Sequence, residues 1–126
     1  MKKEIQNLTE AQKNVWQWCQ DTFEGVAAWK TDKERAYRFF EEAGELFQAM
    51  NMTREDAYKV VDYVFGRPVG ELSQEIGGVM ITLLALASQQ NQNVWDSMET
   101  EYQRITQPDL KQKIRAKQLA KNQAFL

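Results

Sequence analysis

The sequence predicts an all-α protein. Its 126 residues include only 6 Gly and 2 Pro, apolar residues recur at helical spacing, and no segment has the alternation expected of a strand. Apolar residues make up 43% of the chain and charged residues 27%, which is typical of helix-rich globular proteins. We therefore expect one domain with a core that needs neither disulfides nor a structural metal.

Hydroxyl residues three positions before Gln, Glu or Asp mark the starts of the first three helices. These helices are expected over about residues 9–23, 31–50 and 53–65, capped by Thr9, Thr31 and Thr53. The Gly- and Pro-containing loop 66–70 then separates them from the second half of the chain.

Three more helices are expected over about residues 71–90, 93–105 and 108–126. Asn93 caps the second of these, and Pro108 occupies a first-turn position of the third. That last segment holds 5 basic and 1 acidic residues, a net +4, although the whole chain carries −2. The segment therefore differs from the rest of the chain in the sign of its net charge. No repeat is visible.

Composition excludes several kinds of chemistry. The chain has no His, so Ser-His-Asp catalysis and imidazole metal sites are impossible. The single cysteine, Cys19, forms neither an internal disulfide nor a thiolate cage and fits a reducing, cytoplasmic compartment. Any metal must be held by oxygen. The apolar run 76–87 is too short for a membrane span, and the N-terminus lacks a secretory signal, so no membrane partner is expected.

Three carboxylates share one face of the helix over 31–50. Glu41, Glu42 and Glu45 fall within an arc of about 100°, and no Lys or Arg follows them at i+3 or i+4. Each like-charge pair costs about 0.2–0.5 kcal/mol unless a cation neutralises it, and Arg38 gives only partial relief. The arc is either a solvated face or a metal site.

The helix over 71–90 is apolar around most of its circumference and should be largely buried. A narrow stripe of Glu71, Glu75, Gly78 and Thr82 runs down it, and a buried carboxylate needs a cation or a hydrogen-bonding network. Gly77 and Gly78 favour close approach by a neighbour or a ligand. If the two helices pack antiparallel in a bundle, their carboxylates converge on Mg²⁺ or Mn²⁺, and a polyphosphate is the natural substrate.

These two helices resemble the MazG-like all-α nucleoside triphosphate pyrophosphatases, relatives of the dimeric dUTPases and dCTP pyrophosphatases. The family signature is EExxE on one helix and ExxD on a later one. Residues 41–45 match the first half, and residues 74–87 resemble the second helix. The resemblance covers about residues 31–90. It implies a four-helix-bundle core with additional short helices over 1–107, with 108–126 as a basic helical tail of the same domain.

The resemblance also implies hydrolysis of an NTP or dNTP to a nucleoside monophosphate and pyrophosphate with Mg²⁺ or Mn²⁺. By motif position Glu42, Glu45 and Glu75 are metal ligands, and Glu41 is a further ligand or orients the attacking water. Gly78 stands where the family has its final Asp. Either Glu71 or Asp62 is expected to supply that carboxylate.

Basic residues are candidates for neutralising the substrate phosphates. The candidates are Lys30, Arg38, Arg67 and Arg115. The family forms dimers or tetramers, so a homodimer or homotetramer is expected. The alternative is a non-catalytic helical interaction module, or an inactive MazG-like protein whose basic tail binds a partner; a nucleic acid is the less expected of these partners because no binding motif is present.

Overall fold

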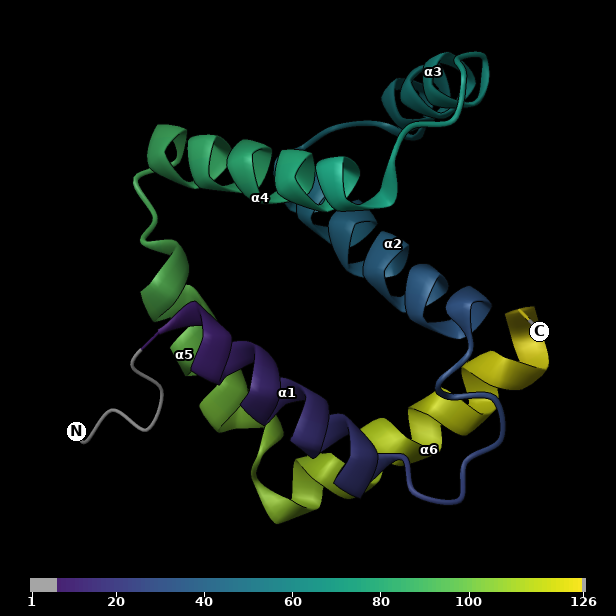
Figure 1. Cartoon of the computed structure of the whole chain (residues 1–126), viewed down its shortest axis with the longest axis vertical. Helices are drawn as coiled ribbons and strands as arrows, with labels where there is room; N and C mark the ends of the chain where they lie inside the picture. Colours follow the sequence, from purple (N-terminus) through teal and green to yellow (C-terminus); the bar gives the residue numbers. More distant parts are fainter. Residues whose placement is uncertain (1–6, 126) are drawn as a thin grey trace. The chain divides into compact units, whose positions relative to one another are not determined.

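A computed structural model describes residues 7–125 of the chain, and it consists of α-helices joined by turns and loops, the longest of which separates α1 from α2 (Figure 1). The helices are α1 (Leu8–Thr22), α2 (Asp32–Ala49), α3 (Arg54–Phe65), α4 (Leu72–Gln89), α5 (Val94–Ile105) and α6 (Pro108–Phe125). No strand occurs in residues 7–125, so the all-α prediction is confirmed.

Side-chain caps start three of these helices as predicted. The side chains of Thr31, Thr53 and Asn93 each accept a hydrogen bond from a backbone N–H in the first turn of α2, α3 and α5. At α3 the capping box is complete, because Asp56 also accepts the Thr53 backbone N–H at 2.9 Å. That hydrogen bond holds the pKa of the Asp56 carboxyl below its ordinary value.

The predicted capping residue of α1 is wrong, and the helix begins one residue earlier than expected. The Asn7 side chain, not that of Thr9, accepts the Glu10 backbone N–H at 2.8 Å, and the helix begins at Leu8. Asn is a stronger N-cap than Thr, since its carboxamide oxygen reaches the first-turn donors readily. Thr9 is then an ordinary first-turn residue.

Two helix–turn–helix pairs share the same backbone plan. In α2–α3 and α4–α5, an 18-residue helix is followed by a short turn and a 12-residue helix, and every boundary of the second pair lies 40 residues after its counterpart. Each turn holds an asparagine with positive φ, Asn51 at 65° and Asn91 at 56°. The next residue donates its N–H to the carbonyl five positions earlier, at 3.2 Å and 2.8 Å. These are Schellman turns, and the repeat is one of backbone rather than of side chains.

The chain divides into two compact units. Residues 7–29 and 84–125 form the terminal unit, and residues 30–83 form the central unit. The basic helix α6 belongs to the terminal unit, where it packs against α1 and α5.

The terminal unit has a small aromatic core. Its buried members are Cys19, Phe23, Val26 and Trp29, with Trp18 and Ile114 packed against them. The Trp18 indole N–H donates to the Ile105 carbonyl at 3.2 Å, which ties α1 to α5.

The central unit has no comparable core. No apolar residue of 30–83 is buried, and α3 buries no residue of any kind. The helix α4 was expected to be largely buried, but Leu72 is 76% and Ile76 is 59% exposed. No helix within residues 7–125 combines the length and apolar character that crossing a membrane demands.

Candidate metal site on α2 and α4

The first half of α2 carries an ion-pair network around Arg38. The Arg38 Nε lies 2.9 Å from a Glu34 carboxylate oxygen, and its Nη1 lies 3.2 Å from an oxygen of Glu41. Glu34 is fully buried, and the Arg38 side chain is only 13% exposed. Two carboxylates therefore already neutralise the guanidinium that the sequence assigns to a substrate phosphate.

Glu34 is the residue of this site that the sequence analysis missed. Its spacing of i to i+4 from Arg38 was the available signal, because such pairs meet on one helix face. A buried carboxylate is stable only with a partner, and here Arg38 provides it. The same guanidinium holds the Glu41 carboxylate at a fixed place on the helix surface.

The other acidic residues of α2 face outward. Glu42 and Glu45 are exposed, and because α2 is helical without interruption, both lie on the arc that includes Glu41. Their oxygens have the hard-ligand chemistry that Mg²⁺ and Mn²⁺ prefer.

The two carboxylates at the start of α4 have separate local roles. Glu71 accepts the Gln74 backbone N–H at 2.7 Å, so it satisfies an orphan donor at the N-terminus of α4. Glu75 folds back beside Gly70, where a Cβ at Gly70 would lie 2.8 Å from the Glu75 Oε1. Only glycine leaves room for that carboxylate position.

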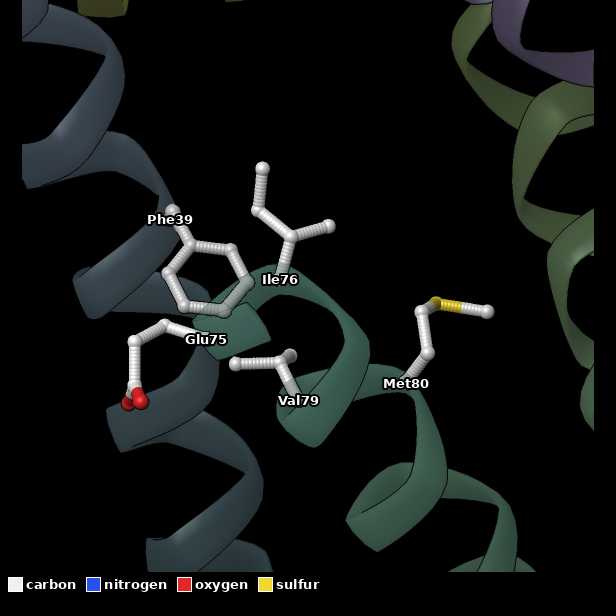
Figure 2. Close-up of a pocket in the computed structure, with 5 residues that line it drawn as sticks. All are labelled: Phe39, Glu75, Ile76, Val79 and Met80. Atoms are coloured by element: carbon white, nitrogen blue, oxygen red, sulfur yellow. The ribbon is translucent and has the colours of Figure 1, made fainter. Parts of the chain in front are cut away.

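A hollow of about 370 Å³ marks where α2 and α4 meet within the central unit. Phe39 lines it from α2, and Ile76, Val79 and Met80 line it from α4. Glu75 stands at its edge, with the carboxylate turned away from Ile76 and Met80 (Figure 2). The hollow itself is therefore apolar, with one acidic group on its rim.

The donor chemistry of the candidate ligands suits a hard cation, but this geometry does not gather them. Among residues 7–125, no three Asp, Glu or Cys side chains lie close enough together to hold a metal ion. Glu42 and Glu45 share a face of α2, whereas Glu71 and Glu75 are engaged around the first turn of α4.

The basic candidates are dispersed. Arg67 lies over the Tyr63 ring, 5.0 Å from its centroid, and donates to the Tyr63 hydroxyl. Arg115, in the terminal unit, donates to the carbonyls of Thr22 and Glu24. Lys30 is exposed at the start of the central unit. Each arginine thus has a local partner in addition to any anion it binds.

No family model, no curated protein and no solved structure matches the chain.

Proposed function

We propose that the protein is a metal-dependent nucleotide pyrophosphohydrolase that cleaves an NTP or dNTP to a nucleoside monophosphate and pyrophosphate. The observation that carries the proposal is the acidic arc of α2, Glu41, Glu42 and Glu45, which lies in the same compact unit as Glu75. The helices that bear these groups meet at Phe39, one turn before Glu42.

The proposed roles follow from the donors. Glu42, Glu45 and Glu75 would hold Mg²⁺ or Mn²⁺, with Glu71 as a further ligand once its side chain leaves the helix N-terminus. The cation would supply Lewis-acid activation of the phosphate and of the attacking water. Glu41 orients that water, and Arg38 fixes the Glu41 carboxylate.

The proposed enzyme is cytoplasmic, and its core is a four-helix bundle completed in a homodimer or homotetramer. Lys30 and Arg67 contribute positive charge for the triphosphate. The direct test is pyrophosphate release from each common NTP and dNTP with Mg²⁺ or Mn²⁺. Absence of turnover for every substrate, in a preparation with native helicity, would refute the proposal.

Removing one negative charge from the acidic arc should affect catalytic rate and thermal stability in different ways. We expect Glu42→Gln or Glu45→Gln to lower kcat at least about 100-fold, since loss of a ligand exceeds the 10–100-fold effect typical of its outer partners. The melting temperature should hold or rise, because a like-charge pair worth about 0.2–0.5 kcal/mol is relieved. Steady-state kinetics and thermal melts measure both.

The matched control is Glu55→Gln, which neutralises an acidic residue in the first turn of α3. It should leave kcat unchanged. A large drop in melting temperature with Glu42→Gln or Glu45→Gln would instead mark those residues as structural.

A second candidate is a non-catalytic interaction module, favoured by two observations. Gly78 occupies the position of the motif Asp, and Lys113 and Lys117 are exposed one turn apart on α6. Binding of an acidic partner through α6 should weaken steeply with salt and survive the Glu→Gln changes. Nucleotide hydrolysis should depend on those carboxylates and on the metal.

A further inference from the structure

We propose that Gly70 is a positioning residue for Glu75: because residue 70 has no side chain, the Glu75 carboxylate can lie beside it at the start of α4. The inference rests on the proposed function, since Glu75 is one of the carboxylates that would hold the cation. Both residues belong to the central unit, and only four residues separate them in the chain, so their contact is local.

The contact involves most of the Glu75 side chain rather than only its tip. A Cβ at Gly70 would lie 2.8 Å from the Oε1, 3.1 Å from the Cδ and 3.3 Å from the Cγ of Glu75. Successive atoms of one side chain therefore lie across the glycine. A Cβ does not approach another heavy atom to within 3.0 Å, so a methyl group at residue 70 would displace the carboxylate from this position.

The backbone at residue 70 does not itself require glycine. Among the described residues, Gly25 is the glycine with positive φ, so Gly70 has a backbone conformation that other residues can adopt. A residue with a side chain would also restrict the unfolded chain and so favour folding. The feature of the structure that excludes a larger residue at position 70 is the Glu75 side chain.

The two residues occupy positions that commonly stabilise a helix start in another way. Glu71 is the N-cap of α4, because its carbonyl accepts the Glu75 N–H at 3.0 Å and its side chain accepts another first-turn N–H. Gly70 and Glu75 are then the N′ and N4 residues, where two apolar side chains often pack as a hydrophobic staple. The helix α3 has apolar residues at both positions, Met52 and Ala57. A departure from such a stabilising pattern is expected at a functional site.

The position of the Glu75 side chain places two carboxylates at one end of α4. Residues four apart on a helix share a face, and the Glu75 carboxylate lies back along that face beside Gly70. The Gln74 N–H, at 2.7 Å, holds the Glu71 carboxylate at the same end. Like charges at this spacing repel each other unless a cation neutralises them. In the proposed site this pair replaces the Glu and Asp of the family motif, since Gly78 stands at the Asp position.

A purely structural role for the contact predicts a different result. An acidic side chain in the first turn of a helix interacts favourably with the positive end of the helix dipole. If that were the whole role of Glu75, displacing its carboxylate would lower stability and leave cation binding unchanged.

Gly70→Ala tests the proposal through Mn²⁺ binding, measured by titration calorimetry and by the paramagnetic resonance signal of free Mn²⁺. The variant should bind Mn²⁺ about 10–100-fold more weakly than wild type, the loss typical of residues that orient a metal ligand. The Mn²⁺ concentration that gives half-maximal pyrophosphate release should rise by a similar factor. The melting temperature without metal should hold or rise, because alanine restricts the unfolded chain.

Gly66→Ala is the matched control, because it makes the same substitution in the same loop. A Cβ there would lie 3.1 Å from the Asp62 carbonyl oxygen and would meet no carboxylate. This variant should leave Mn²⁺ affinity unchanged, whatever its effect on melting temperature.

A double-variant cycle identifies the residue through which Gly70 acts. In the Glu75→Ala background, no long side chain remains for the added methyl group to displace. Adding Gly70→Ala there should change Mn²⁺ affinity by less than about 2-fold, the range within which independent substitutions are additive.

Unchanged Mn²⁺ affinity in Gly70→Ala overturns the proposal, as does an equal loss in Gly66→Ala or a loss that persists in the Glu75→Ala background. A loss accompanied by a lower melting temperature would assign Gly70 to the stability of the α4 N-terminus instead. If wild type binds Mn²⁺ and releases pyrophosphate and Gly70→Ala does both equally well, only this inference fails. If wild type does neither, the proposed function fails with it.

Discussion

Arg115 shows how one side chain serves a purpose that its sequence position does not reveal. The sequence assigns it to a phosphate, because it lies in a basic segment of net +4. In the structure its guanidinium donates to the Thr22 carbonyl at 3.1 Å and also to the Glu24 carbonyl, at the C-terminal end of α1. Helix C-termini carry partial negative charge, so a cation is stabilising there. Which anion or carbonyl an arginine meets is set by tertiary structure.

Replacing Arg115 tests that role. Arg115→Met should lower the free energy of unfolding by about 1–2 kcal/mol, since it removes charge-assisted hydrogen bonds to carbonyls that are then less well satisfied. Urea denaturation measures the change. The control, Arg104→Met, breaks an exposed pair with Glu101 at 2.7 Å and should cost about 0.3–0.5 kcal/mol. Unchanged stability combined with a raised KM would assign Arg115 to the substrate instead.

Helix starts were predictable because caps act locally. Thr31, Thr53 and Asn93 each contact a backbone N–H three residues away, so a short window of sequence contains the whole interaction. The placing of three carboxylates on one arc of α2 was predictable for the same reason. The expected meeting of that arc with Glu75 depends on how two distant helices pack, and within residues 7–125 no three acidic side chains are gathered closely enough to hold a metal ion.

The repeated turn was missed for a different reason. Asn51 and Asn91 recur with a 40-residue offset, but the side chains around them differ, and only the backbone reveals the match. Asparagine tolerates the left-handed conformation better than other non-glycine residues do. A single asparagine can therefore end each of the two long helices, and no longer sequence motif marks the turn.

Substitutions in these turns should follow backbone strain. Asn51→Ala and Asn91→Ala should each lower stability by about 1 kcal/mol, because alanine resists positive φ. Asn51→Gly and Asn91→Gly should be neutral or slightly stabilising. Thermal melts measure the change. Gln92→Ala, at the exposed position after Asn91, is the control and should have little effect. Equal losses for alanine and glycine would show that the carboxamide, not φ, matters.

At the scale of the molecule, the two units differ in how they are stabilised. The terminal unit buries Cys19, Phe23, Val26 and Trp29 around α1, whereas the central unit buries no apolar side chain. All 4 tryptophans lie outside residues 30–83. Indole fluorescence therefore reports on the terminal unit, while far-ultraviolet circular dichroism reports on both.

The two signals should separate when the protein is diluted. If association stabilises the central unit, helical signal should be lost at lower urea than indole fluorescence changes, and the gap should narrow as protein concentration rises. Parallel urea titrations at several concentrations measure this. Coincident transitions at every concentration would show that the two units unfold as one, independently of assembly.

The position of Cys19 has a practical consequence. It is the one thiol of the chain and is 8% exposed within the terminal core, so maleimide reagents reach it poorly. A cysteine introduced on either unit will then accept a spin label or a dye selectively, with the native residue left in place. Inter-label distances measured between the two units would then report on how those units are arranged in solution.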